Sequence, residues 1–154
     1  MREVRVVPVT PRSFAGVRRV VQRTEVPREL IAGLDTVWSV IRARQLDRHG
    51  HNIAVYREAG EETVEMECGV EVGDPFTPEG EIEIRTTPGG TAVCATHVGP
   101  VQRIGETYRR IDRWLAECDI APLGVSWEVY GHASEETGAF YTDIFMLVPA
   151  DATT

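Results

Sequence analysis

Two stretches of the chain carry apolar residues at the spacing of an α-helix, and each follows a proline. After Pro27 the apolar positions are Leu30, Ile31, Leu34, Val37, Trp38 and Ile41. After Gly99-Pro100 they are Val101, Ile104, Tyr108, Ile111 and Leu115. Such a stripe is the core-facing side of a helix, and proline is well tolerated in a first turn. We therefore predict helices over residues 27–46 and 100–118.

Elsewhere, apolar and polar residues alternate as in strands with one buried face. In the clearest case Val64, Met66 and Cys68 point one way, while Glu65 and Glu67 point the other. Alternation and turn residues together predict strands at residues 4–9, 13–22, 52–57, 64–72, 80–86, 91–98, 124–131 and 139–148. The last two are expected to form a hairpin through residues 132–138, and Gly and Pro predict a loop at 73–78.

The predicted elements occur in the order β-α-β-β twice. Pro27 and Pro100 are 73 residues apart, and Tyr56 and Tyr130 are 74 apart. A near-constant offset indicates an internal duplication. The predicted fold class is α+β: two pseudo-two-fold β-α-β-β modules, at about 13–72 and about 91–148, form an antiparallel sheet with two long helices and a central ligand cleft. We expect a single domain over residues 1–154.

Composition narrows the class of protein. The net charge of -8 and the pI of about 5.0 argue against direct binding to nucleic acid. Solubility is the simplest explanation of this charge, and attraction of cationic ligands is the alternative. The cysteines Cys68, Cys94 and Cys118 form no Cys-x-x-Cys pair, and the histidines lack ligand spacing, so neither a disulfide framework nor a metal site is expected. No phosphate-binding glycine loop, signal peptide or membrane-spanning run is recognised. We expect a cytoplasmic protein without a cofactor or membrane partner.

One carboxylate breaks the symmetry of the repeat. When NIAVY (52–56) is aligned with SWEVY (126–130), Glu128 stands opposite Ala54. Alternation places Glu128 on one face of its strand with Ser126 and Tyr130. The other face carries Val125, Trp127 and Val129. This apolar face is expected to pack on the helices, which leaves Glu128 on the open face.

The neighbouring strand is expected to complete an aromatic surface around Glu128. Its more apolar set, which begins at Phe140, is assigned to the helix side, so Tyr141, Asp143 and Phe145 would share the open face with Glu128. Aromatic rings and a carboxylate together recognise organic cations. The candidate ligand-binding residues are Glu128, Tyr141, Asp143, Phe145, Tyr56, Trp38, Tyr130 and His97.

Several of these candidates also have a structural alternative. A glutamate on an open sheet face is commonly just solvated. Asp143 could pair with an arginine or a hydroxyl group. Trp38 lies on the apolar stripe of the first helix and also fits the core, and a lone histidine such as His97 commonly has a structural hydrogen-bonding role.

Four segments together resemble a known family. FAGVRR (14–19), HVGPVQRIGETYRRIDRWL (97–115), SWEVYG (126–131) and TDIFMLVP (142–149) are similar to the GyrI-like small-molecule-binding domain of bacterial AraC-type and MerR-type multidrug-responsive transcription regulators. The resemblance implies a duplicated β-α-β-β fold with a central cleft. It also implies that Glu128 meets lipophilic cationic drugs in an aromatic pocket, with Asp143 and Phe145 as matched residues. Val101 departs from the family pattern, which often has an aromatic residue there.

Three functions follow from the residues and the resemblance. The leading hypothesis is a stand-alone module that binds hydrophobic, cationic, drug-like molecules. A hydrolase that opens cyclopropane rings in genotoxic natural products is an alternative, with Glu128 as base and Asp143 or Tyr141 as acid. A second alternative is a protein-interaction module, for example one that contacts gyrase. We expect no helix-turn-helix region before the first strand, so any link to transcription is expected to need a protein partner that the sequence does not identify.

Overall fold

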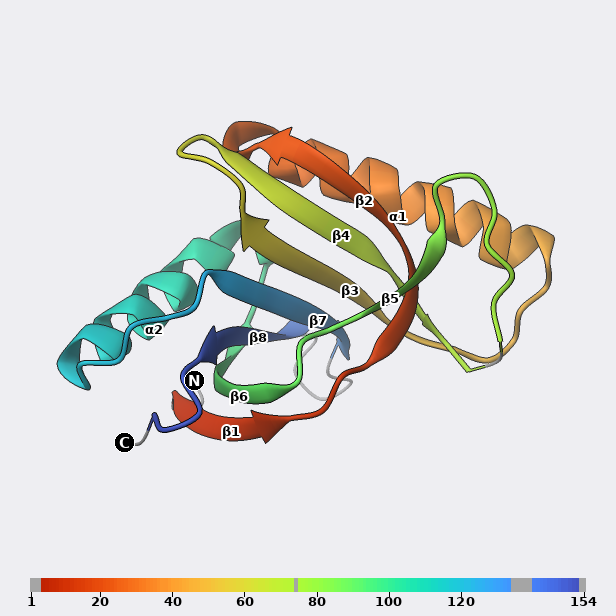
Figure 1. Ribbon diagram of the computed structural model, residues 1–154. Helices are drawn as coiled ribbons and strands as arrows, with labels where there is room; N and C mark the ends of the chain where they lie inside the picture. Colours follow the sequence, from red (N-terminus) through yellow and green to blue (C-terminus); the bar gives the residue numbers. More distant parts are fainter. Residues whose placement is uncertain (1–3, 74, 134–139, 153–154) are drawn as a thin grey trace. The chain divides into compact units, whose positions relative to one another are not determined.

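The computed structural model describes residues 4–73, 75–133 and 140–152, which contain strands and two long helices (Figure 1). The elements are β1 (Arg5–Val9), β2 (Ser13–Gln22), α1 (Val26–Ala43), β3 (His49–Glu58), β4 (Thr63–Val72), β5 (Glu83–Thr86), β6 (Gly90–Val98), α2 (Ile104–Glu117), β7 (Val125–Ala133) and β8 (Phe140–Val148). Short 3-10 turns, η1 (Arg23–Glu25) and η2 (Val101–Arg103), precede the helices. The predicted α+β class is confirmed.

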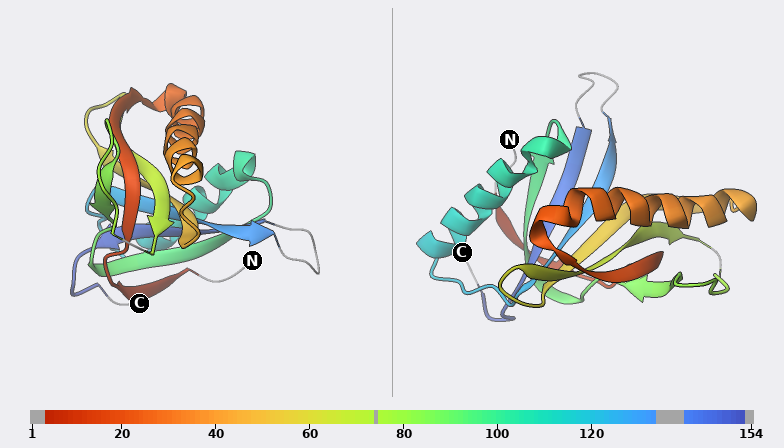
Figure 2. Two further views of the ribbon diagram at one scale, coloured as in Figure 1. Left: turned by 90° about the vertical axis from the view of Figure 1, so that its right-hand side faces the viewer. Right: turned by 90° about the horizontal axis from the view of Figure 1, so that it is seen from above.

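The chain divides into two compact units, and the first comprises residues 11–87. Its strands are antiparallel neighbours in the order β3-β4-β2-β5. Helix α1 lies along β2 and β4 (Figures 1 and 2). The helix comes so close that a Cβ atom at Gly33 would lie 2.5 Å from Cys68 Sγ. Glycine at this position therefore permits the close packing of α1 on β4.

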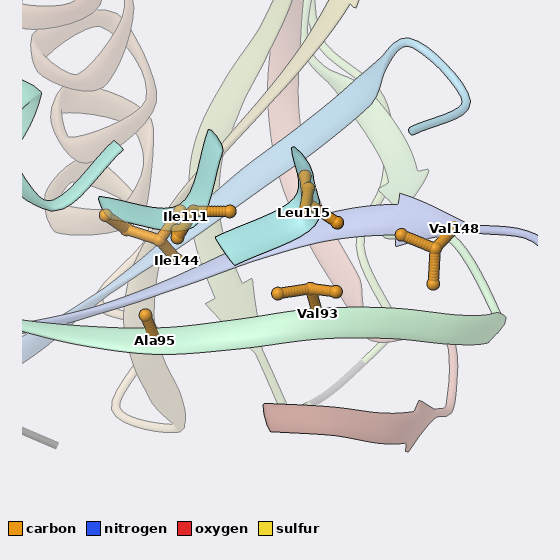
Figure 3. Packing of buried hydrophobic residues seen from close by; sticks show 6 residues of the cluster. All are labelled: Val93, Ala95, Ile111, Leu115, Ile144 and Val148. Carbon is orange, nitrogen blue, oxygen red and sulfur yellow. The ribbon is translucent and has the colours of Figure 1, made fainter. Parts of the chain in front are cut away.

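The second unit comprises residues 1–10 and 88–154. Its strands are antiparallel neighbours in the order β1-β6-β8-β7. Ile111 and Leu115 of α2 point toward the strands in Figure 3, where they complete a hydrophobic core. The buried members of this core are Val93, Ala95, Ile111, Leu115, Ile144 and Val148. The apolar stripe predicted for the second helix therefore faces β6 and β8.

The two units repeat the same β-α-β-β order, and their details coincide. The buried residues of α1 (Gly33, Val37 and Ile41) each lie 74 positions before those of α2 (Thr107, Ile111 and Leu115). The strand pairing is also equivalent in the two units, because the matched residues Ala54 and Glu128 each pair with the next strand of their own unit, opposite Cys68 and Ile144. Strands β1 and β5 each add an edge strand to one unit. The predicted duplication is confirmed, whereas the single domain over residues 1–154 stays a prediction.

Some predicted boundaries move for identifiable reasons. The first helix ends at Ala43 rather than at residue 46, because Gln45 has a φ of 55°, in the left-handed region that helices do not continue through. Asp119 has the same φ just after α2. The first turn after Pro100 is the 3-10 turn η2, so α2 itself begins at Ile104. Most of the hairpin linker predicted at 132–138 lies outside the described residues.

Candidate functional site

Glu128 lies buried in β7, and both of its carboxylate oxygens accept hydrogen bonds from phenols. The residue is 6% exposed. The Tyr108 hydroxyl of α2 donates to Oε2 at 2.5 Å, and the Tyr130 hydroxyl of β7 donates to Oε1. Burial of a carboxylate is costly unless it is hydrogen-bonded. The two phenols therefore make it possible to hold Glu128 inside the protein.

The packing of α2 on β8 brings Tyr108 to Glu128. Glu128 and Tyr130 are two residues apart in β7, so they share one face of the strand. In the β7–β8 ladder Glu128 is opposite Ile144, and Ile144 packs in the same core as Ile111 of α2. Tyr108 precedes Ile111 by three residues, which places it on the same side of the helix. The core contact thus places α2 on the face of the sheet that carries Glu128.

The electrostatics of Glu128 differ from those of an ion-paired carboxylate. Burial raises the pKa of Glu128, while the hydrogen bonds from Tyr108 and Tyr130 and the nearby ring of His97 act in the opposite direction. The groups that favour the ionised form of Glu128 among the described residues are the two phenols and the His97 ring, and none of the three is an arginine or a lysine.

Glu67 of β4 is a useful contrast, because it is also buried but has cationic partners. It is 9% exposed. Arg57 Nη1 donates to its Oε1, and Arg85 Nη1 lies 3.4 Å from its Oε2. The charge on Glu67 is therefore balanced inside its own unit, as is usual for buried acids. Of the two, Glu128 is the carboxylate that could accept a cation from outside.

His97 has both ring nitrogens in hydrogen bonds. It is 4% exposed at the end of β6. Nε2 lies 2.8 Å from the Pro100 carbonyl oxygen, and Nδ1 lies 2.7 Å from Thr107 Oγ1. The structural alternative considered for this histidine is therefore the role that it has here. Its prediction as a ligand contact is not tested.

The predicted grouping of Glu128 with Tyr141, Asp143 and Phe145 is wrong. Directly opposed residues of an antiparallel pair share a face. Glu128 is opposite Ile144, and Trp127 is opposite Phe145, so Phe145 lies on the other face of the sheet from Glu128. The prediction assumed that the helix would cover the apolar side of β7. Instead, Tyr108 of α2 provides a polar partner, which allows Glu128 to face the helix.

The opposite face has its own contacts. The ring of Trp127, 2% exposed, stacks on Phe145 with centroids 5.3 Å apart and 9° between the planes. Thr96 Oγ1 of β6 donates to Asp143 Oδ1 at 2.7 Å. Asp143 thus has the hydroxyl partner that was considered as its structural alternative. Tyr141 is half-buried on this same face, opposite Val98.

The remaining candidates, Trp38 and Tyr56, belong to the first unit. Trp38 Nε1 donates to Asn52 Oδ1 at 2.9 Å. Its ring meets the ring of His49 edge-on, with centroids 4.8 Å apart. Tyr56 is half-buried in β3, at the position that corresponds to Tyr130. Whether either residue contacts a ligand stays a prediction.

Tyr108 is a site residue that the hydrophobic pattern of the sequence assigns to the core alone. It lies on the apolar stripe of α2, where an aromatic ring usually indicates packing. A signal was nevertheless available. With the offset of 74 that relates the helices, Tyr108 corresponds to Leu34, just as Glu128 corresponds to Ala54. In the alignment of the repeat, Tyr108 therefore differs from its matched residue in the same way as Glu128 does.

Other kinds of site are not found in the described part of the chain. Residues 4–73, 75–133 and 140–152 contain no group of three or more His, Cys, Asp or Glu that could hold a metal ion. In the same ranges, neither helix has both the length and the apolar character needed to cross a membrane.

The fold and the site define an α+β domain of duplicated β-α-β-β modules with one buried, phenol-bound carboxylate. Residues 2–149 match the GyrI-like small molecule binding domain. The chain therefore belongs to the GyrI-like family, as the sequence motifs predicted. A comparison with curated protein sequences gave no match.

Solved structures share the fold at low sequence identity. The EcmrR C-terminal domain has a TM-score of 0.72 and 19% identity, with 96% of this chain and 97% of that chain covered. SAV2435 bound to tetraphenylphosphonium has a TM-score of 0.65 and 12% identity, with 96% and 94% covered. A hydrolase from Listeria innocua has a TM-score of 0.60 and 11% identity, with 96% and 92% covered. These likenesses concern the fold.

Proposed function

We propose that this protein binds bulky hydrophobic cations and that Glu128 is the acidic residue that receives the positive charge. The observation that carries the proposal is a buried carboxylate whose only hydrogen-bond donors in the described residues are the phenols Tyr108 and Tyr130. Burial raises the pKa of Glu128, so its ionised form is less favoured than that of a carboxylate in water. A cation near the carboxyl group would favour the ionised form.

The two tyrosines suit a hydrophobic guest as well as the carboxylate. Each ring presents an apolar surface, and its hydroxyl stays on Glu128. A cation over such a ring gains cation–π attraction in addition to its attraction to the carboxylate. Membership of a small-molecule-binding family supports this use, as does the tetraphenylphosphonium bound to SAV2435.

The test consists of two titrations. Binding of tetraphenylphosphonium is measured by calorimetry, and binding of a rhodamine dye is measured by its fluorescence. We expect Glu128→Gln to weaken binding of both cations by about 30-fold or more, because loss of a buried charge partner costs at least about 2 kcal/mol. Tetraphenylborate has a similar shape and the opposite charge, so it should bind the wild type much more weakly. Equal affinities of wild type and Glu128→Gln for the cations would refute the role of the carboxylate.

Two further variants sharpen the experiment. Glu62→Gln removes one negative charge from an exposed bend and controls for the overall charge of the protein. We expect it to bind like the wild type. Asp143→Asn changes the acid on the opposite face of the sheet, which already accepts a hydrogen bond from Thr96. A loss as large as that of Glu128→Gln would mean that the site lies on the Asp143 face.

A hydrolase is the second candidate, and the raised pKa of Glu128 is the observation that favours it. A carboxylate with a raised pKa is a stronger base than an ordinary carboxylate, which suits a general base toward water. In cyclopropane opening, the oxygen of water bonds to one ring carbon as a C–C bond of the ring breaks, and a neighbouring phenol could protonate the atom that takes up the released electron pair. Incubation with a cyclopropane-containing alkylator followed by product analysis decides the matter, and unchanged substrate rejects this function.

A further inference from the structure

His97, near the end of β6, contacts two residues of the segment that leads into α2, and the farther of them, Thr107, lies ten residues along the chain. Nε2 is 2.8 Å from the Pro100 carbonyl oxygen, at the start of η2, and Nδ1 is 2.7 Å from Thr107 Oγ1, in the first turns of α2. His97 is 4% exposed and Thr107 is 1% exposed. The imidazole ring is thus a buried bridge between two points of the segment that leads into the helix.

The hydrogen-bond partners determine which nitrogen carries the proton. The Pro100 carbonyl oxygen can only accept, so Nε2 of His97 must donate. In the neutral ring Nδ1 then accepts from the Thr107 hydroxyl. The Pro100 oxygen also accepts from the Arg103 N–H at 3.0 Å, which ties the histidine directly to the turn η2. Both ring nitrogens are therefore used within the protein.

Thr107 is followed in sequence by Tyr108, and this links His97 to the candidate site. Thr107 faces His97, and the next side chain turns about 100° around the helix, toward Glu128. The Tyr108 hydroxyl lies 2.5 Å from Glu128 Oε2, and a displacement of about 1 Å would lengthen this contact beyond hydrogen-bonding range. The helix must therefore be held in place at Thr107 for Tyr108 to reach the carboxylate.

The first unit supports this connection, because none of the four residues that form it in the second unit has an identical residue at the matched position of the first. The matched residues Ala54 and Glu128 are opposite Cys68 and Ile144, so Met66, two residues before Cys68, corresponds to Thr142. Met66 is opposite Arg19 and Thr142 is opposite His97, so Arg19 corresponds to His97. The offset of 74 between the helices matches Thr107 with Gly33 and Tyr108 with Leu34. Ala54 stands where the second unit has Glu128. The histidine, the threonine, the tyrosine and the glutamate are thus present together in one unit and absent together from the other.

We propose that His97 is a positioning residue: by bridging Pro100 and Thr107 it fixes the beginning of α2 so that the Tyr108 hydroxyl stays on Glu128. The consequence for ligands rests on the proposed function, whereas the positioning itself can be measured in the empty protein. Removal of the bridge should release Tyr108 from Glu128 while the core around Ile111 and Leu115 remains folded.

The decisive measurement is NMR of ring-labelled tyrosine, followed through the ζ-carbon shift and the exchange of the hydroxyl proton. The chain has four tyrosines, and Tyr→Phe variants assign each signal. Thr107→Val keeps the shape of the side chain and removes its hydroxyl, and Thr107→Ser restores the hydroxyl. We expect the Tyr108 signal to change in Thr107→Val and to have its wild-type position in Thr107→Ser. The Tyr130 signal should be the same as in the wild type in both variants.

His97 itself is tested in the same way. His97→Leu removes both hydrogen bonds, whereas His97→Gln keeps one donor and one acceptor and should recover at least part of the Tyr108 signal. Val148→Ala weakens the same hydrophobic core without touching the bridge, so it serves as the control for lowered stability. We expect it to leave the Tyr108 signal unchanged at a comparable loss of thermal stability.

Affinity for tetraphenylphosphonium is the second readout. Thr107→Val should bind about tenfold more weakly, as expected for loss of one hydrogen bond near 1.4 kcal/mol, and Thr107→Ser should bind like the wild type. If the wild type binds no cation, the proposed function fails but the NMR comparison still tests the positioning. An unchanged Tyr108 signal in folded Thr107→Val and His97→Leu would overturn the positioning role, even if both variants are less stable.

Discussion

Tyr108 and Glu128 are 20 residues apart in sequence, and their side chains meet in a hydrogen bond of 2.5 Å between α2 and β7. The contact joins a residue on the apolar stripe of a helix to the buried acid of a strand. It explains why Glu128 faces the helix rather than the open side of the sheet. It also makes the helix part of the candidate site.

Tyr108→Phe tests the energy of this contact. The variant removes one of the two donors to a buried carboxyl group, so we expect the free energy of unfolding near neutral pH to fall by about 1–3 kcal/mol. Urea unfolding measures the change. Tyr141→Phe is a suitable comparison, because Tyr141 lies on the other face of the sheet, and it should change stability by no more than about 0.5 kcal/mol. Equal losses in the two variants would contradict the assigned role of Tyr108.

The raised pKa of Glu128 predicts a specific dependence of stability on pH. A carboxyl group with a raised pKa in the folded state binds more protons there than in the unfolded chain. Its contribution to the free energy of unfolding therefore falls as pH rises from about 4.3, the ordinary value for Glu, up to the folded pKa. In Glu128→Gln this pH-dependent contribution is absent, so the free energy of unfolding of the variant should increase relative to that of the wild type as pH rises. Parallel curves from pH 4 to pH 8 would show that the pKa is not raised.

The cysteines should differ in reactivity. Burial raises the pKa of the Cys68 thiol and of the Cys94 thiol to about 11 each, and these residues are 0% and 2% exposed. At pH 8 only about one in a thousand of each is thiolate, the reactive form. Iodoacetamide should therefore modify the half-buried Cys118 first, with Cys68 and Cys94 reacting only after denaturation. Mass spectrometry of the native protein reads the order, and early loss of Cys68 would contradict the prediction.

Two substitutions of glycine by alanine should change the stability of the protein in opposite directions. A Cβ atom at Gly69 of β4 would lie 1.8 Å from the backbone oxygen of Ala15, so Gly69→Ala should destabilise the protein by more than about 3 kcal/mol. At Gly105 of α2 the nearest atom would be Arg109 Nη1 at 3.4 Å. Gly105→Ala should therefore stabilise the protein by about 0.5–1 kcal/mol. Thermal unfolding compares both variants with the wild type.

The periodicity of the sequence is sufficient to predict the helices and strands, because burial of one face gives each kind of element its own spacing of apolar residues. The stripe that contains Ile111 and Leu115 and the alternation around Cys68 both correspond to observed cores. The duplication could also be predicted, since matched residues keep a nearly constant offset. These features depend on local spacing, which a single sequence contains.

The orientation of β7 could not be obtained in this way. Alternation divides a strand into two faces, but it does not say which face meets the helix. Val125, Trp127 and Val129 are the apolar set of β7, and their apolar character alone favours them as the side that faces the helix. The actual orientation depends on contacts from distant segments: the phenol of Tyr108 in α2, and the ring of Phe145 in β8, which stacks on Trp127.

The duplicated fold gives this protein its own internal reference. The two units have the same order of elements and the same three buried helix positions, yet Ala54 and Leu34 stand in one where Glu128 and Tyr108 stand in the other. What the units share is what the architecture requires in order to fold. A short set of polar residues distinguishes the second unit from the first, and these are the residues that form the candidate site.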